Sequence, residues 1–131
     1  MATNSRPAWP IATGNGLNNE LRGNSAVNIL TGLGGDDVYV VQNTDDTVVE
    51  AADGGVDKLY SVISRTLGAN VEDLRLTRTA YKGQGNALAN SISGKSSANL
   101  FIGGNGNDTL TGNGGSEITS SIPHLLFLVH S

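Results

Sequence analysis

The chain has 131 residues, enough for one compact domain, and its net charge of −4 argues against nucleic acid or an anionic membrane surface as a partner. It contains no cysteine, which excludes disulfides and thiolate metal sites. Residues 1–13 have no apolar core like that of a cleavable signal peptide and are expected to form an N-terminal tail. No stretch approaches the roughly 20 apolar residues of a membrane-spanning helix.

Nine-residue repeats begin at Gly14 and run without insertion to Val49. The sixth position of each unit holds Asn or Asp, and the eighth holds an apolar or aromatic residue. The 18 glycines would suggest disorder, but the 37% hydrophobic content and its regular spacing argue against it. The units are GNGLNNELR, GNSAVNILT, GLGGDDVYV and VQNTDDTVV, with Asn19, Asn28, Asp37 and Asp46 at the sixth position.

This period suits a six-residue turn followed by a three-residue strand whose central side chain points inward. If two units complete one coil, units two apart in sequence stack on the same side. Leu21 is then expected over Tyr39, and Leu30 over Val48. We predict an all-β, right-handed parallel β-roll, or β-solenoid, over residues 14–120.

The segment 50–84 loses this register, because the step from Asp46 to Asp57 is 11 residues. We expect the solenoid to continue here with wider rungs. The acids in this segment have no spacing signature and are predicted to be turn or surface residues. Residues 67–72 are expected to form a tight turn or a short helix. The apolar residues that suggest longer strands are Leu59, Val62, Leu74 and Leu76, and the acids are Asp57, Glu72 and Asp73.

A second block of four units occupies residues 85–120: GNALANSIS, GKSSANLFI, GGNGNDTLT and GNGGSEITS. The same stacking rule places Ile92 over Leu110 and Asn99 near Glu117. The last unit fits the pattern worst, with glutamate at its sixth position, and is predicted to be a degenerate cap.

The unit GGNGNDTLT at 103–111 matches G-G-x-G-x-D-x-U-x, the calcium-binding nonapeptide, at every defined position. Gly103, Gly104 and Gly106 allow the backbone to curl with its carbonyl oxygens inward, and Asp108 adds a carboxylate. Calcium takes about six to eight hard oxygen ligands, which two stacked turns can supply together.

The chain therefore resembles the RTX (repeats-in-toxin), or hemolysin-type, calcium-binding repeat regions of large secreted bacterial proteins. Residues 46–77 are also similar to the variant segment that often separates nonapeptide blocks in that family. The resemblance implies a β-roll that folds on extracellular calcium and accompanies type I secretion. It implies calcium ligands in three turns: Asp108 with carbonyls of Gly103, Gly104 and Gly106, Asp37 with those of Gly32, Gly34 and Gly35, and Asp46.

Asparagine at half of the eight sixth positions departs from the family pattern. Each candidate site then has one acid from its two turns, which predicts a few weak sites. Alternatively, asparagine ladders bridge the turns without metal, in a structural solenoid used for adhesion or self-assembly. Asp36 and Asp45 are predicted to be solvated surface acids. Stacking pairs Asp37 with Asn19, Asp46 with Asn28, and Asp108 with Asn90, and each of these asparagines is predicted to belong to the metal site of its partner acid.

No catalytic motif such as H-E-x-x-H or G-x-S-x-G occurs, and His124 and His130 are predicted to be incidental. We expect a secreted binding or stabilising module, not an enzyme. A third hypothesis makes the chain a detached targeting region of a protease, lipase or epimerase.

Two surface features have open interpretations. The outward positions Val38, Val40, Leu100 and Ile102 are apolar, which indicates either cover by another segment or a contact surface for a partner domain or second copy. Residues 121–131 shift abruptly in composition and are either an end cap or a C-terminal secretion signal.

Overall fold

The computed structural model describes residues 11–52, 54–95, 98–113, 117–120 and 125–129, the last two ranges by their backbone alone. Throughout these ranges the chain forms short strands joined by turns, with no helix. All the strand pairs are parallel. The prediction of an all-β parallel solenoid is confirmed.

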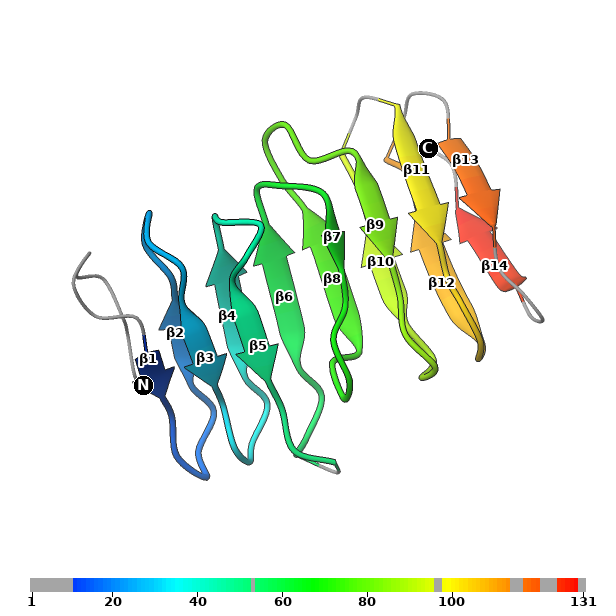
Figure 1. Cartoon of the computed structure of the whole chain (residues 1–131). Helices are drawn as coiled ribbons and strands as arrows, with labels where there is room; N and C mark the ends of the chain where they lie inside the picture. The colour runs from blue at the N-terminus through cyan, green and yellow to red at the C-terminus, as the bar shows by residue number, and fades with distance from the viewer. Residues whose placement is uncertain (1–10, 53, 96–97, 114–116, 121–124, 130–131) are drawn as a thin grey trace.

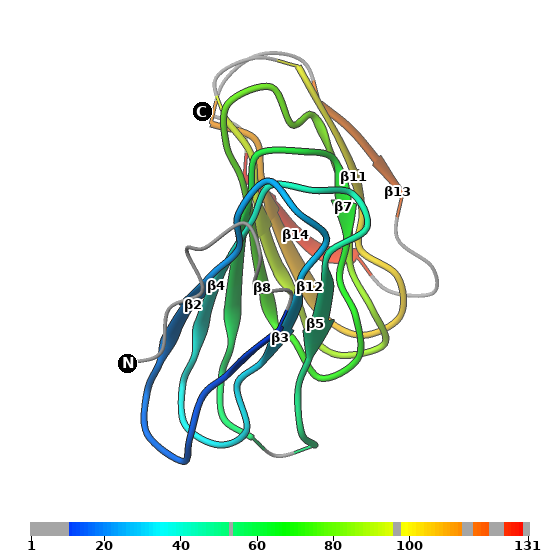
Figure 2. The same cartoon turned by 60° about the vertical axis from the view of Figure 1, so that its left-hand side comes forward.

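Two layers of strands face each other, and the chain alternates between them as it advances along the solenoid (Figures 1 and 2). One layer is a seven-stranded sheet of β2 (Glu20–Arg22), β4 (Val38–Val41), β6 (Lys58–Ser61), β8 (Asp73–Leu76), β10 (Ser91–Ser93), β12 (Asp108–Thr111) and β14 (Leu125–Val129). The other layer is divided into one sheet of β1 (Ile11–Thr13), β3 (Ile29–Thr31) and β5 (Thr47–Val49), and another of β7 (Arg65–Thr66), β9 (Lys82–Gln84), β11 (Asn99–Ile102) and β13 (Glu117–Ser120).

The turns gather along two edges of the solenoid. We call the edge at the bottom of Figure 1 the lower edge; it holds the turns that lead into the seven-stranded sheet. The upper edge holds the turns that lead into the opposite layer. The lower-edge turns comprise residues 14–19, 32–37, 50–57, 67–72, 85–90 and 103–107.

The core is a stack of the inward central side chains of the short strands. On a pleated strand the neighbours of an inward residue point outward. Each strand of the seven-stranded sheet from β2 to β12 buries at least one large apolar side chain, worth roughly 1.5–3 kcal/mol. The predicted stacking of Leu21 with Tyr39, Leu30 with Val48, Ile92 with Leu110 and Asn99 with Glu117 is confirmed. Along the seven-stranded sheet the buried column is Leu21, Tyr39, Leu59, Leu74, Ile92 and Leu110, each at most 1% exposed.

The irregular segment continues the solenoid with coils of unequal length. Residues that stack on the lower edge are 18 apart in the repeat blocks, but Asp37 and Asp57 are 20 apart and Asp57 and Glu72 are 15 apart. The expectation of wider rungs therefore holds for the first of these coils and is wrong for the second. Residues 67–72 form a turn, with Asn70 at φ 67°, and contain no helix.

The opposite layer is interrupted between β5 and β7, which do not pair. Arg65 in β7 lies across this break. Its guanidinium donates hydrogen bonds to the carbonyl oxygens of Thr44, at 3.2 Å, and Asp46. A side-chain cation thus joins two rungs where the backbone ladder is broken.

The outward apolar positions are half-buried. Val38 and Val40 line a shallow groove on the outer face of the seven-stranded sheet, together with Tyr60 and Val62. Leu100 and Ile102 lie on the opposite layer. A role for either pair in partner contact stays a prediction.

The C-terminal segment adds a rung, since β14 pairs in parallel with β12. Whether the segment serves as a cap or an export signal stays a prediction, and His124 and His130 lie outside the described residues. Across the described part of the chain, no helix has the length and apolar character needed to cross a membrane.

Candidate metal centre

The sixth-position residues of the lower edge, together with Asp57 and Glu72 of the irregular segment, form one continuous polar column. The backbone N–H of Asn19 donates to Asp37 Oδ1 at 2.7 Å, and that of Asn90 donates to Asp108 Oδ1 at 2.9 Å. All four of these residues are buried, with at most 3% exposed. The predicted pairing of Asp37 with Asn19, and of Asp108 with Asn90, is therefore present as direct hydrogen bonds between rungs.

Asparagine turns and aspartate turns differ in backbone conformation. In the turns of Asn19, Asn28 and Asn90, the side-chain Oδ1 accepts the N–H of the second residue of the same turn at 2.8 Å. These asparagines thus cap their own turns. The turns of Asp37 and Asp108 instead place their second and fourth residues in the left-handed region: Leu33 (φ 80°), Gly35 (φ 96°), Gly104 (φ 89°) and Gly106 (φ 99°).

The predicted carbonyl donors lie where the turns contact each other. A Cβ on Gly85 would clash with the carbonyl oxygen of Gly103, and one on Gly14 would lie 2.8 Å from that of Gly32. Gly34 lies against Gly16 of the neighbouring lower-edge turn. Glycine is required at positions 14 and 85, because a side chain there would separate the rungs, whereas a Cβ on Gly34 would make only ordinary contact with Gly16. Coordination by these carbonyls stays a prediction.

Asp37 is the acid whose surroundings fit a metal ion most directly. It is 1% exposed, and within the described structure its Oδ2 accepts no hydrogen bond. Burial raises the pKa of Asp37, and the charge of Asp36 adds to this rise, against the opposing hydrogen bond from Asn19. A buried carboxylate oxygen without a donor is costly unless a cation approaches it. Calcium, which the nonapeptide motif implies, has the hard-oxygen preference that this position satisfies.

Asp46, on the upper edge, differs from Asp37. Its Oδ1 accepts the N–H of Asn28 at 2.8 Å, as predicted from stacking, and its Oδ2 accepts the N–H groups of Gln42 and Asn43 at 3.3 and 3.1 Å. Three backbone donors and the nearby Arg65 already compensate this carboxylate. Its role as a ligand stays a prediction.

Two acids of the irregular segment also belong to the lower-edge column. Asp37 N–H donates to Asp57 Oδ1, and Asp57 N–H donates to Glu72 Oε2, both at 2.8 Å. Of the two alternatives predicted for Asp57, a turn or a surface acid, the first holds and the second is wrong, because Asp57 lies in a turn but is 0% exposed. The missed signal was the acid–x–apolar spacing of Asp57 with Leu59 and Glu72 with Leu74, which equals that of Asp37 with Tyr39.

Burial is the largest cause that raises the pKa of Asp57, to about 7. Repulsion from Glu50, Glu72 and Asp37 adds to it, against the hydrogen bond from Asp37 N–H. Asp36 and Asp45, by contrast, are exposed, as predicted.

Asparagine side chains also bridge rungs directly. Asn86 Nδ2 donates to the carbonyl oxygens of Gly68 and Val71 at 2.7 and 2.8 Å, and Asn43 Nδ2 donates to that of Ser25 at 3.3 Å. These bonds need no metal. The rungs are therefore held in part by amide hydrogen bonds between protein atoms, whereas the Oδ2 atoms of two buried lower-edge acids, Asp37 and Asp57, accept no hydrogen bond in the described structure.

The comparisons with known proteins agree with this architecture. The model of the RTX calcium-binding nonapeptide repeat matches residues 13–48 and 84–116, in four copies, which together make up about half of the chain. The chain belongs to this family, a class of calcium-binding β-roll.

Among characterised proteins, the chain is similar to two from Rhizobium meliloti (strain 1021). It is 37% identical over 100 residues to the endo-1,3-1,4-beta-glycanase ExsH and 36% identical over 98 residues to the endo-1,3-1,4-beta-glycanase EglC. These alignments cover 70% and 69% of the chain but only 22% and 21% of the relatives, so the chain spans about a fifth of their length. No solved structure matches.

Proposed function

We propose that the chain is a calcium-responsive module that orders on exposure to extracellular calcium and thereby stabilises a secreted protein. It acts by binding and folding, with no catalytic activity of its own. The observation that carries the proposal is the buried column of acids on the lower edge, in which Asp37 has a carboxylate oxygen with no donor in the described structure.

The energetics support coupling between calcium and folding. Ordering the backbone costs roughly 1–2 kcal/mol per residue, whereas each nine-residue unit buries about one large apolar side chain. Calcium bound only to the folded state would add about 2.7 kcal/mol per site at a hundredfold excess over its dissociation constant. A thin solenoid can therefore depend on the ion for folding.

Secretion and a larger parent protein are part of the same proposal. Calcium is abundant outside cells and scarce inside them, so a module of this kind would stay weakly ordered until export. The relatives named as endo-1,3-1,4-beta-glycanases support a parent protein that acts on polysaccharide, in place of the protease, lipase or epimerase hypothesis. The sequence of the flanking gene region tests this point.

The second candidate function is a calcium-independent structural solenoid. It is favoured by the rung-bridging hydrogen bonds of Asn43 and Asn86. Far-ultraviolet circular dichroism of the wild type and of a double variant, Asp37→Ala with Asp108→Ala, separates the two. Calcium-induced strand signal that the double variant loses supports the calcium module. Equal strand signal in both proteins, with or without chelator, supports the amide ladder.

A further inference from the structure

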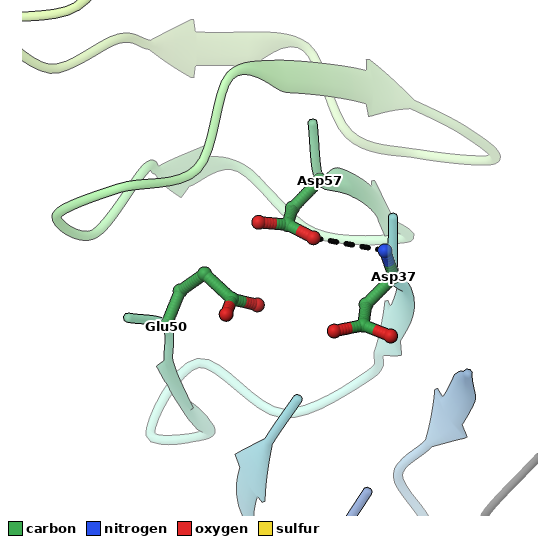
Figure 3. A group of neighbouring side chains, drawn as sticks. All are labelled: Asp37, Glu50 and Asp57. Carbon is green, nitrogen blue, oxygen red and sulfur yellow. Dashed lines mark hydrogen bonds between the residues drawn. The ribbon is translucent and has the colours of Figure 1, made fainter. Parts of the chain in front are cut away.

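Three carboxylates converge between two lower-edge turns at the junction of the first repeat block with the irregular segment (Figure 3). Asp37 precedes β4, Glu50 follows β5, and Asp57 precedes β6. They are 1%, 8% and 0% exposed, and one oxygen from each lies within 4.8 Å of the others. The stacking of the turns on either side of β4 and β5 brings them together.

The hydrogen bonds of this cluster hold the carboxylates in place but leave two carboxylate oxygens without a hydrogen bond in the described structure. Asp37 Oδ1 accepts Asn19 N–H and Asp57 Oδ1 accepts Asp37 N–H, at 2.7 and 2.8 Å. Glu50 Oε1 accepts Ala51 N–H at 3.0 Å, and Glu50 Oε2 accepts the Tyr39 hydroxyl. In the described structure the Oδ2 atoms of Asp37 and Asp57 accept none, although both side chains are fully buried.

The charges around the cluster are of one sign. The charged side chains that shift the pKa values of Asp37 and Asp57 are Asp36, Asp37, Glu50 and Glu72, all of them acids. Buried like charges repel strongly in a medium of low dielectric constant, and an ion pair or a metal is the usual compensation. A divalent cation would satisfy both orphan oxygens.

Glycines and backbone oxygens lie beside the cluster. A Cβ on Gly32 would clash with Asp37 Oδ2 and the Tyr39 hydroxyl and would lie 2.8 Å from Glu50 Oε2, so only glycine fits next to these oxygens. Around Gly54, the carbonyl oxygens of Leu33 and Ala51 lie close to Glu50 Oε1. A donor set made only of carboxylate and carbonyl oxygens suits a hard cation. Calcium is commonly held by protein oxygens alone, whereas magnesium usually keeps several waters, so this donor set favours calcium.

We propose that Asp37, Glu50 and Asp57 form a calcium site that fastens the irregular segment to the first repeat block. Glu50 and Asp57 lie outside the residues matched by the nonapeptide model, and Glu50 does not occupy a sixth position. The site therefore goes beyond the repeat turns, although it deepens the proposed function because the ion is the same.

Tyr39 provides a selective readout, since its hydroxyl bonds directly to a proposed ligand. Terbium, a hard trivalent probe for calcium sites, emits when a nearby excited tyrosine transfers energy to it. Terbium added to the full chain should emit on tyrosine excitation, and calcium should displace it. Tyr39→Phe should abolish most of this emission. Glu50→Gln should weaken terbium binding about a hundredfold, because ligand charge sets affinity in such sites.

Glu50→Gln keeps the size of the side chain. Its remaining oxygen can still accept Ala51 N–H, and its amide nitrogen can donate to the Tyr39 hydroxyl oxygen, so the fold should persist in chelator. Asp45→Asn, an exposed acid on the upper edge, is the matched control and should emit as the wild type does. The proposed site would be overturned if terbium emission from Glu50→Gln equalled that of the wild type, if emission from Tyr39→Phe were undiminished, or if the wild type gave no emission. Calcium-induced strand signal, measured by circular dichroism in the same proteins, reports separately on the proposed function. The proposed function fails only if the wild type shows no calcium-induced strand signal.

Discussion

Replacing Asp57 by asparagine should have opposite effects on stability without and with calcium. Without calcium, Asp57 is a buried carboxylate surrounded by Asp37, Glu50 and Glu72. The neutral amide removes this repulsion, and its oxygen can still accept the N–H of Asp37. With calcium, the same substitution removes an anionic ligand.

The magnitude follows from the pKa of Asp57, which is raised from 3.8 to about 7. The full shift corresponds to about 4 kcal/mol near neutral pH, and screening by solvent at the edge of a thin roll reduces the expected gain to about 1–2 kcal/mol. In calcium, the variant should lose roughly the 2–3 kcal/mol that one well-occupied site contributes.

Urea denaturation at pH 8, in excess chelator and in saturating calcium, measures both effects. Asp45→Asn serves as the exposed control and should change neither value. A loss of stability in chelator, or equal changes in the two conditions, would refute this account of the lower edge.

The pH dependence of the calcium-free wild type follows from the same group. Because the folded chain binds the Asp57 proton more tightly than the unfolded chain, this stabilising contribution is complete below about pH 4. It declines as the pH rises through about 7. The urea midpoint in chelator should therefore be higher at pH 5 than at pH 8, and the Asp57→Asn variant should lack most of this difference.

Three further predictions concern the turns. Arg65→Gln should lower the free energy of unfolding by about 2 kcal/mol, because two turn carbonyls lose a charged donor. The loss should be equal with and without calcium. The control Arg22→Gln, at an exposed ion pair, should lower the free energy of unfolding by less than about 0.5 kcal/mol. Leu33→Asn should raise the free energy of unfolding in urea by about 1 kcal/mol, since leucine at φ 80° is strained and asparagine tolerates this conformation; a decrease would contradict the strain. Gly85→Ala should destabilise the folded chain by about 1–3 kcal/mol, because the added Cβ clashes with the next turn. Gly16→Ala should not, since no atom lies within 4 Å of its added Cβ. Similar melting temperatures for the two variants would contradict the close approach of the turns.

The repeat blocks could be predicted from the sequence because each rung is specified locally. A turn rich in Gly, Asn and Asp and one apolar residue recur every nine positions, so the pairing of Leu21 with Tyr39 follows from counting. The aspartate turns were likewise visible, since Gly104 and Gly106 stand where the backbone is left-handed. Leu33 occupies the same position without being glycine, and nothing local marks it as strained.

The junction site could not be predicted in full, because it depends on the path of the irregular coils. A coil of 20 residues followed by one of 15 breaks the period, so Asp57 and Glu72 fall out of phase although they return to the same column. Glu50 reaches the cluster only because its turn stacks on that of Asp37, and Arg65 bonds to the upper edge only because β5 and β7 do not pair. Both are properties of the three-dimensional path of the chain.

The central claim is that calcium binds acids which only the stacked rungs bring together, so that binding and folding are one equilibrium. The most direct test is the free energy of unfolding of the wild type in urea, measured over a range of free calcium concentrations. The account predicts a rise of about 1.4 kcal/mol per tenfold increase in calcium for each coupled site, once the concentration exceeds the dissociation constant. A free energy of unfolding that does not change with calcium would contradict it.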